Sequence, residues 1–451
     1  MSQASQAVPP TSLRHVMLAS AVGSALEWYD FFIYGTAAAL VFGELFFPKY
    51  DTTVGTLAAF ATFGVGFVAR PFGGLFFGHF GDRIGRKPML VATLMLVGGG
   101  TFLIGLLPTY AAIGVWAPLL LVLMRLIQGF GAGAEYSGAV IFAVEYAPAG
   151  QRGFYGSFPP MGVAFGNLLA AGVFYLVTLL PKDALFAWGW RVPFLLSFLI
   201  LGLGVYIRAK LAETPVFAEV EATRPVLRAP IVEALRRHPR NFLVVIGARL
   251  AENGLGYLFP VFGLSYIVNT LHMPRSVGIT GVMVGTFAEI IGIFFFSWLS
   301  DKVGRRPVYL GGALFSAAFA FPFFLLTATL SPGLIWLAFV AVLGIGLAAM
   351  FGPQAAFFAE LFGPRLRFSG FAFARELGSV LAGGPAPFIA ALLVGWMGGA
   401  PWGVACYVIL LSLLTAFAVW CGPETHAVDL AEDRVEEGVA VEKAPRLVPG
   451  A

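Results

Sequence analysis

Charged side chains stand inside some of the most apolar stretches of this sequence. Glu27 and Asp30 lie in the first such stretch, Arg125 lies in a later one, and Arg249 and Glu252 lie in another. A charge at the centre of a membrane helix costs about 2.5 kcal/mol or more, so such residues usually mark a pathway for ions, protons or polar molecules. An arginine can hold a ligand carboxylate through two hydrogen bonds, and a buried carboxylate can take up and release a proton.

Helical spacing places several of these residues on common faces. Glu27 and Asp30 are three residues apart, and Arg249 and Glu252 have the same spacing. Residues three or four positions apart lie on one side of a helix. Each face continues with residues that could contact a bound molecule, which are Phe31 and Tyr34 on the first helix and Asn253 and Tyr257 on the second.

The composition indicates that a membrane surrounds the helices that carry these charges. The 451 residues are 59% hydrophobic and 12% charged, with a mean hydropathy of +0.85, which leaves too little polar surface for a soluble globule. A membrane span needs about 20 apolar residues, and the sequence contains twelve such stretches. The predicted spans are 17–46, 55–80, 89–107, 115–146, 154–180, 187–207, 241–268, 277–299, 308–329, 334–361, 368–396 and 402–421.

One polar phrase follows the second span of each half of the chain. It reads GDRIGRKP at 81–88 and SDKVGRRP at 300–307. A glutamate and an arginine seven residues apart also recur between the fourth and fifth spans of each half. These repeats predict two parallel six-helix bundles around a site at the middle of the membrane. They also predict an inner gate that joins the bundles, formed by Asp82, Arg83, Arg86, Glu145, Arg152, Asp301, Arg305, Glu360 and Arg367.

The loops between spans differ in charge from one side to the other. Lys and Arg concentrate in the loops that hold the two phrases, which predicts that both chain termini are cytoplasmic. Those bases could serve topology alone, but the interleaved acids favour a gate, with Asp82 and Asp301 facing the positive N-terminus of a neighbouring helix. The expected parts are a cytoplasmic arm at 1–16, a bundle at 17–207, a linker at 208–240, a bundle at 241–421 and an acidic cytoplasmic tail at 422–451.

Several segments carry a family resemblance. GHFGDRIGRKP at 78–88 and RLIQGFGAGAEY at 125–136 resemble loop and fourth-helix motifs of the major facilitator superfamily. ALEWYDFFIYG at 25–35, with ARPFGGLFFGHFGDRIGRK at 69–87 and RLAENGLGYLF at 249–259, resembles its metabolite/proton symporter family, which includes permeases for α-ketoglutarate, citrate, shikimate and proline or betaine. The resemblance implies an all-α membrane protein with twelve transmembrane helices in two pseudo-symmetric six-helix bundles, the major facilitator fold.

Candidate roles follow for the charged and aromatic residues. Asp30 with Arg125 is the favoured proton-coupling pair, Glu135 is the rival acid, and a permanent ion pair of Asp30 with Arg125 is the structural alternative. Asp30 and Arg249 hold equivalent positions in the two halves and could couple them directly or through substrate. Glu289 and Glu376 are expected to form structural pairs. The predicted substrate-binding residues are Glu27, Trp28, Tyr29, Arg70, Gln128, Tyr136, Arg249, Glu252, Asn253 and Tyr257.

These residues predict a secondary active transporter that moves a small carboxylate-bearing metabolite by proton symport and alternating access. A proton-coupled transporter of a zwitterion such as proline or betaine is the alternative, because acids and bases both occur within the spans. A non-transporting membrane receptor is an alternative of another class. An enzyme is not expected, since HExxH, CxxC and GxSxG are absent from a credible setting.

The expected partners are the substrate, protons and the lipid bilayer. The positive net charge of +4 needs no nucleic acid, because the excess of basic residues is explained by loop topology. No cofactor and no metal are expected. Cys406 and Cys421 lie in or at the end of the last span and predict no disulfide framework. We expect a monomer with many spans in a plasma membrane, the inner membrane of a bacterium.

Overall fold

The computed structural model describes most of the chain. Its backbone is described for residues 13–50, 52–84, 86–133, 135–148, 150–210, 235–363, 366–428 and 430. Within these ranges, the side chains of 14–16, 19, 52, 78–79, 81–84, 86–88, 90, 135 and 203–210 fall outside the description. The described residues form helices joined by short turns, with no strand among them.

The N-terminal half forms one bundle of helices. Leu13–Leu40 is a single helix, α1, in which Glu27 and Asp30 lie beyond the midpoint. The other elements of this half are α2 (Phe42–Phe46), α3 (Thr52–Ile84), α4 (Arg86–Leu106), α5 (Tyr110–Ile113), α6 (Trp116–Gly131), α7 (Glu135–Tyr146), α8 (Arg152–Gly156), α9 (Phe158–Thr178), α10 (Lys182–Ala187), the 3₁₀ turn η1 (Gly189–Arg191) and α11 (Val192–Lys210).

The C-terminal half forms a second bundle beside the first. Its long helices are interrupted by π-helical segments, in which each turn contains an extra residue. Its elements are α14 (Pro239–Tyr257), the π segments η2 (Leu258–Gly263) and η3 (Tyr266–Thr270), α15 (Arg275–Val303), α16 (Arg305–Ala328), α17 (Pro332–Ala341), the π segment η4 (Val342–Leu347), α18 (Ala348–Glu360), α19 (Arg367–Gly378), the π segment η5 (Ser379–Gly383), α20 (Ala386–Trp396) and α21 (Trp402–Cys421).

Helices occupy each of the twelve predicted spans. Nine helical stretches within the described residues are long and apolar enough to cross a membrane, and Val91–Leu106 and Gly189–Gly202 are shorter apolar helices. The first predicted span, 17–46, coincides with α1 and α2. Several predicted spans contain two or three consecutive elements, because a turn or a π segment interrupts the α-helix.

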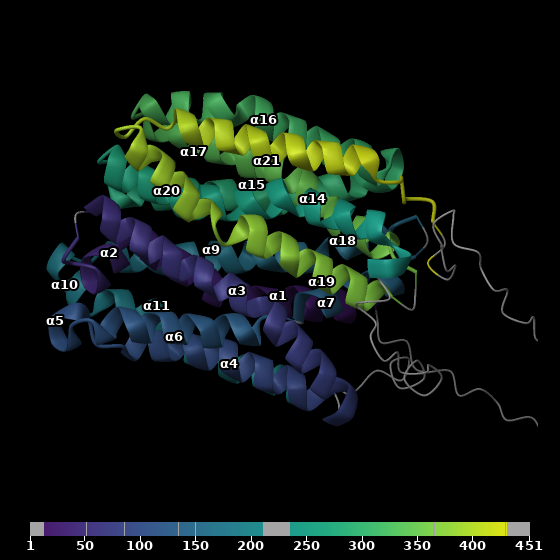
Figure 1. Cartoon of the computed structure of the whole chain (residues 1–451), viewed down its shortest axis with the longest axis horizontal. Helices are drawn as coiled ribbons and strands as arrows, with labels where there is room; N and C mark the ends of the chain where they lie inside the picture. The colour runs from purple at the N-terminus through teal and green to yellow at the C-terminus, as the bar shows by residue number, and fades with distance from the viewer. Residues whose placement is uncertain are drawn as a thin grey trace, which may run out of the picture.

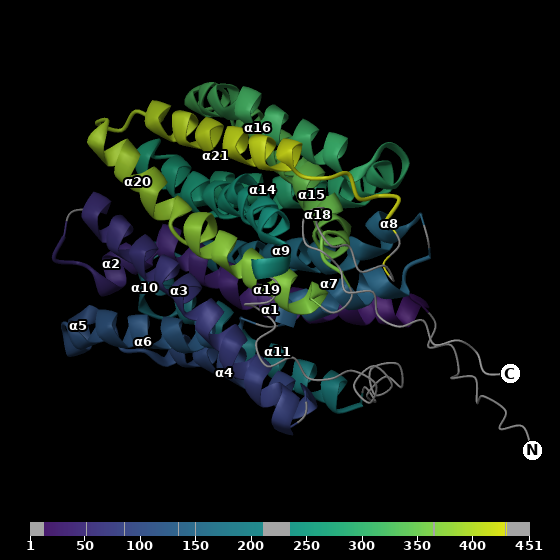
Figure 2. The ribbon, with the colours of Figure 1, turned by 45° about the vertical axis from the view of Figure 1, so that its right-hand side comes forward.

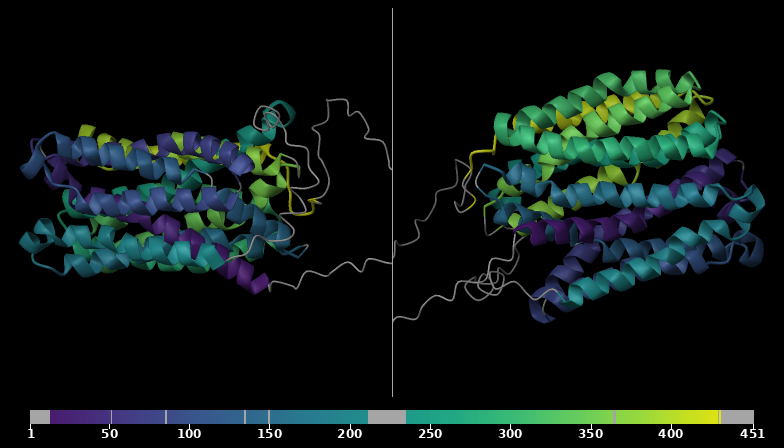
Figure 3. Two further views of the ribbon diagram at one scale, coloured as in Figure 1. Left: turned by 90° about the horizontal axis from the view of Figure 1, so that it is seen from below. Right: turned by 180° about the vertical axis from the view of Figure 1, so that it is seen from behind.

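The two bundles lie side by side with their helices running lengthwise (Figures 1 and 3). The N-terminal bundle, purple to blue, faces the C-terminal bundle, green to yellow, along the whole length. Contacts between bundles join α9 to α15, α3 to α19 and α20, and α7 and α8 to α18. The start of α1 and the end of α21 lie at the same end of the molecule (Figure 2).

Glycines allow the helices of the N-terminal bundle to approach closely. A Cβ atom at Gly129 of α6 would lie 1.9 Å from the carbonyl oxygen of Gly66 in α3, and one at Gly133 would lie 2.1 Å from the carbonyl oxygen of Arg70. Any side chain at either position would therefore push the helices apart. This close approach fixes Arg70 of α3 and Arg125 of α6 within one small region of the bundle.

Candidate substrate and proton site

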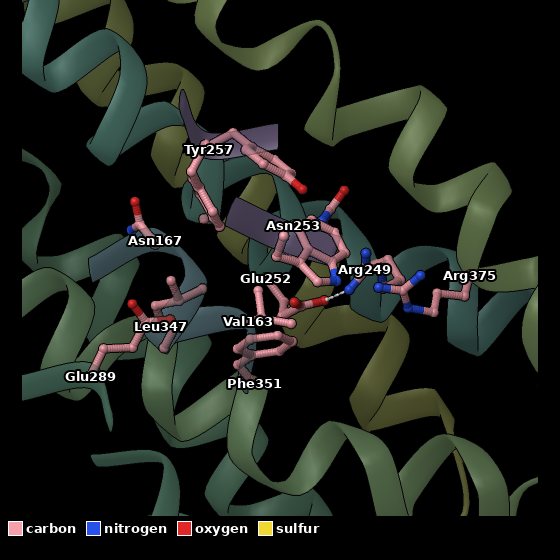
Figure 4. A pocket seen from close by; sticks show the side chains of 14 residues that line it. Val163, Asn167, Arg249, Glu252, Asn253, Tyr257, Glu289, Leu347, Phe351 and Arg375 are labelled. Carbon is pink, nitrogen blue, oxygen red and sulfur yellow. Dashed lines mark hydrogen bonds and ion pairs between the residues drawn. The ribbon is translucent and has the colours of Figure 1, made fainter. Parts of the chain in front are cut away.

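A small cavity of about 30 Å³ lies between the two bundles. Both halves line it, which is the position expected for the substrate of a two-bundle carrier. Four polar residues of α14 lie along it, together with aromatic residues from α1 and α18 (Figure 4). The lining comprises Trp28, Phe32, Val163, Ala164, Asn167, Arg249, Glu252, Asn253, Gly256, Tyr257, Glu289, Leu347, Phe351 and Arg375.

Two arginines of the C-terminal bundle, Arg249 and Arg375, line one end of this cavity. Arg249 Nη1 lies 2.5 Å from Glu252 Oε2, and its other terminal nitrogen donates to Ser379 Oγ at 2.9 Å. Arg375 pairs with Glu376 at 2.5 Å and lies 3.9 Å above the ring of Tyr136. Both arginines are buried. A carboxylate that binds here would lose its hydrogen bonds to water and gain hydrogen bonds from the two guanidinium groups.

Arg70 reaches the same region from the N-terminal bundle. Its Nη1 lies 3.9 Å from Glu376 Oε2, a contact that crosses between the halves. No hydrogen-bond partner is found within the described residues for any of its three guanidinium nitrogens. The guanidinium lies 4.9 Å from the Trp28 ring centroid. Buried donors without acceptors are costly, and a bound carboxylate would satisfy them.

Other polar atoms at the cavity also lack partners. The Tyr257 hydroxyl, the Trp28 indole N–H and Asn253 Oδ1 are buried without a hydrogen bond to any residue that the structure describes. Trp28 and Tyr257 stack with ring centroids 6.2 Å apart. Most buried polar groups in proteins are satisfied, so this concentration of open donors and acceptors points to a ligand.

Asp30 lies inside the N-terminal bundle, apart from the arginine cluster. Its Oδ1 accepts a 2.7 Å hydrogen bond from Ser197 of α11. The predicted direct contact with Arg125 is not present within the described part of the chain. Gln128 stands between the two residues instead, donating to the Asp30 carbonyl oxygen at 3.2 Å and accepting from Arg125.

Arg125 is enclosed by aromatic rings rather than by acids. Its guanidinium lies 4.3 Å from the ring centroid of Tyr34 and 4.7 Å from that of Phe31. Asp30 also makes no direct contact with Arg249, which is paired with Glu252. The two predicted contacts of Asp30, with Arg125 and with Arg249, are both absent among the described residues because each of these residues has a nearer partner. Alignment of the two repeats could not reveal those partners.

Some residues predicted to bind substrate lie away from the cavity. The Tyr29 hydroxyl donates to the carbonyl oxygen of Pro193 at 2.9 Å and so faces α11. Gln128 donates a hydrogen bond to Thr101 Oγ1 at 2.8 Å, within the N-terminal bundle. Tyr136 donates to Gln354 Oε1 at 3.3 Å, across the bundle interface beside Arg375. Glu27 is buried in α1 but does not line the cavity. The side chain of the rival acid Glu135 lies outside the described residues.

Two polar cavity residues, Glu289 and Asn167, were not among the predicted substrate contacts. Glu289 was recognised as a charge within a span, but no spacing signal connected it to the α14 face. Asn167 was overlooked because it is the single amide in a run of small and apolar residues on α9. A search for all polar residues within spans would have included it.

The predicted gate residues of the C-terminal half meet at one end of the bundles. This end, called the gate end, contains Asp301, Arg305, Glu360 and Arg367. Asp301 accepts hydrogen bonds from the backbone N–H groups of Gly153 and Phe154, both at 2.8 Å, at the start of α8. Carboxylates are stabilised by the first N–H groups of a helix. This contact fastens the C-terminal bundle to the N-terminal one.

Ion pairs continue this connection. Arg305 binds Asp301 at 2.6 Å and Glu360 at 3.1 Å, and Arg367 binds Glu145 of the other bundle at 2.7 Å. Glu145 was expected near Arg152, but Arg152 donates instead to the carbonyl oxygen of Val428 at 2.5 Å. The side chains of Asp82, Arg83 and Arg86, the matching phrase in the first half, lie outside the described residues.

Comparison with known proteins agrees with this architecture. Residues 16–229 match the family described as "Sugar (and other) transporter", and residues 244–447 match the Major Facilitator Superfamily. The shikimate transporter of Escherichia coli is 41% identical over 412 residues, covering 89% of this chain and 93% of that protein. The chain belongs to the major facilitator superfamily. The predicted resemblance is therefore confirmed.

Other proteins similar to this chain are named for different substrates. A proline/betaine transporter of Salmonella typhimurium is 38% identical, covering 85% of this chain and 78% of that protein. A solved structure of the proton:xylose symporter XylE has a TM-score of 0.72 and covers 93% of this chain and 98% of its own, at 19% identity. This likeness confirms the predicted all-α fold. The superfamily member is a multi-pass membrane transporter and not an enzyme.

Proposed function

We propose that this transporter moves a small carboxylate-bearing metabolite together with protons, by alternating access. The arginine end of the cavity is the observation that carries this proposal. Arg249 and Arg375 line the cavity from the C-terminal bundle, and Arg70 of the N-terminal bundle lies next to them, 3.9 Å from Glu376. A carboxylate bound among them would contact both halves at once, so its binding would favour a closed state.

The aromatic wall favours a carboxylate over a quaternary ammonium group. Such cations bind to the open faces of aromatic rings. The Trp28 face already has the Arg70 guanidinium above it at 4.9 Å. The shikimate transporter among the relatives supports a hydroxylated carboxylic acid, while the proline/betaine transporters keep a zwitterion as the second candidate.

Asp30 is the proposed proton-binding group. It is a buried acid whose side chain accepts a hydrogen bond from Ser197, and Gln128 links its backbone to Arg125. Proton uptake there can alter the packing of α1 against α11, and α1 also presents Trp28 to the cavity. Glu135 remains the rival acid.

Alternating access requires that the gate end opens and closes. The contacts of Asp301 with α8 and of Arg367 with Glu145 hold the bundles together at that end. We assign the gate end to the cytoplasmic side of a bacterial inner membrane, with both chain termini on that side, because the loops there are rich in Lys and Arg.

Uptake into proteoliposomes tests this function. Purified protein should accumulate radiolabelled shikimate, or another acid from a panel that includes proline and glycine betaine, when the outside is acidic. A proton ionophore should abolish accumulation but not exchange of labelled for unlabelled substrate. Uptake that is indifferent to the ionophore would indicate a facilitator, and binding without exchange would indicate a receptor.

A further inference from the structure

The cavity has two chemically different ends. Arg249 and Arg375 stand at one end, and Glu289 and Asn167 stand at the other (Figure 4). The wall between the two ends includes apolar side chains of Val163, Leu347 and Phe351. A ligand that bridged these two ends in a more open state would have an acidic group at the arginine end and a different polar group at the far end.

Glu289 is the unexplained residue at the far end. It lies on α15 and is only 4% exposed. The structural pair expected for it is not found among the described residues, and its side chain lines the cavity instead. Burial of a polar group without a partner is unfavourable, so this carboxyl group is available to a ligand.

Asn167 brings the other bundle to the same place. Its side-chain nitrogen donates to Thr286 Oγ1 at 3.0 Å, and Thr286 lies one turn before Glu289 on α15. This hydrogen bond joins α9 of the N-terminal bundle to α15 of the C-terminal bundle. A ligand group at Glu289 therefore lies where the two halves meet.

We propose that Glu289, beside Asn167, is a subsite that accepts a hydrogen bond from a hydroxyl group of the substrate. The substrate class is then a cyclic carboxylate with a ring hydroxyl on the side opposite its carboxylate. This assignment rests on the proposed function and makes it more specific. An α-amino acid fits less well, because its ammonium group is only one carbon from its carboxylate and both groups would lie at the arginine end.

Paired ligands test the subsite. Binding of shikimate and of cyclohex-1-ene-1-carboxylate, which has the same ring and no hydroxyls, is measured by calorimetry on full-length protein in nanodiscs. The unaltered protein should prefer shikimate. Glu289→Leu should weaken shikimate binding by about 10- to 100-fold and leave the affinity for the deoxy analogue within about twofold. Glu289→Gln, which keeps one acceptor oxygen, should lose less.

Controls separate this role from folding. Phe287→Leu alters a side chain on the same helix that is 58% exposed and should leave both affinities unchanged. If Glu289→Leu does not fold, Glu289→Gln and the unaltered protein still provide the comparison. Equal weakening of both ligands by the Glu289 variants would overturn the subsite, because a purely structural wall has no preference for hydroxyls.

Two further results distinguish the subsite from the proposed function. If the unaltered protein binds no carboxylate, the proposed function fails and the subsite fails with it. If it binds both ring acids equally, only the subsite fails. The same comparison is made with proline and cyclopentanecarboxylate. If the unaltered protein prefers proline to cyclopentanecarboxylate and Glu289→Leu abolishes that preference, the hydroxyl assignment is wrong and the subsite binds an ammonium group.

Discussion

Arg70 is held by aromatic rings instead of hydrogen bonds. Its guanidinium lies 4.2 Å from the Phe31 ring centroid and 4.9 Å from those of Trp28 and Phe67. A planar, weakly hydrated guanidinium stacks on such rings, while a lysine ammonium keeps its charge but cannot present two parallel donors. The shape of the group at this position, and not its charge alone, should therefore determine carboxylate binding.

Arg70→Lys should weaken binding of the best carboxylate by about 10-fold or more. The measurement is calorimetry on purified protein. Arg191→Lys is a matched control, because Arg191 also lies over an aromatic ring, that of Trp190 at 4.3 Å, but belongs to η1 and not to the cluster of Arg70 with Glu376. If the Arg70→Lys variant bound the carboxylate with unchanged affinity, Arg70 would not bind it through two parallel hydrogen bonds.

Asp30→Asn mimics a permanently protonated carboxyl group. The variant should still bind substrate and exchange it, because exchange requires only that the loaded carrier reorients. It should lose accumulation driven by a pH gradient, which needs proton release. Counterflow and pH-driven uptake on one preparation test both expectations. Ser197→Ala, which removes the donor to Asp30 and keeps the acid, should retain accumulation.

Two other results would contradict this role for Asp30. Full accumulation by Asp30→Asn would exclude it as the coupling acid and favour Glu135. Loss of folding, binding and exchange together would indicate a structural role. Sequence patterns identified the acid, because charges within apolar runs are conspicuous, but they could not identify Ser197 as its partner, which is far away along the chain.

At the scale of single elements, the segment after α21 connects several helices at the gate end. Residues 422–428 and 430 form this segment, called the C-terminal strap. Glu424 accepts from the backbone N–H groups of Arg305 and Arg306 at 2.9 and 3.0 Å. The carbonyl oxygens of Val428 and Leu430 accept from Arg152 and Arg367. The strap thus contacts both bundles.

The strap should be sensitive to acid through Glu424. Burial alone would raise the pKa of this carboxyl group, but hydrogen bonds from four backbone N–H groups outweigh burial and leave the pKa below its ordinary value of 4.5. A lowered folded-state pKa stabilises the fold above pH 4.5, and this contribution is lost as the pH falls through the lowered value.

Glu424→Gln should therefore lower the melting temperature at pH 7 by about 2–4 °C. The difference from the unaltered protein should shrink as the pH falls below 4.5. Melting curves across that range measure both effects. Glu44→Gln, at an exposed ion pair with Lys182, is the control and should change little. A difference that stays constant with pH would show that ionisation of Glu424 is irrelevant to the strap.

The helices themselves were predictable to different degrees. Apolar runs of sufficient length gave all twelve spans, since the membrane requires a continuous hydrophobic surface. The π segments η2, η4 and η5 were not predicted, because the extra residue in each turn depends on packing against neighbouring helices. They matter for the site: η4 contributes Leu347 to the cavity wall, and η2 begins directly after Tyr257.

For the whole molecule, the contacts between bundles determine how easily the gate end opens. Asp301→Asn removes a charge that accepts two backbone N–H groups of α8 and binds Arg305. Amide hydrogen exchange in α8 should accelerate by about 10-fold, the equivalent of about 1.4 kcal/mol. Net transport should slow, and substrate affinity should stay within about twofold. Asp183→Asn, on α10, is the control.

An unchanged exchange rate in α8 would mean that Asp301 does not fasten the bundles. Repetition in the sequence predicted that both halves contribute to this end, and it identified Asp301, Arg305, Glu360 and Arg367. It could not predict that Arg367 of the C-terminal bundle binds Glu145 of the N-terminal bundle, or that Arg152 donates to Val428 of the strap. Those choices depend on how the finished bundles dock.

The position of the C-terminal strap in the chain also sets the order in which the protein is completed. Its residues follow α21 directly in the sequence, so the strap can dock only when the helices that it joins are in place. Until then, Arg152 lacks the Val428 carbonyl oxygen and the first turn of α16 lacks its Glu424 cap. Newly inserted protein should pass through a stage in which its bundles are formed but loosely joined, and docking of the strap ends that stage.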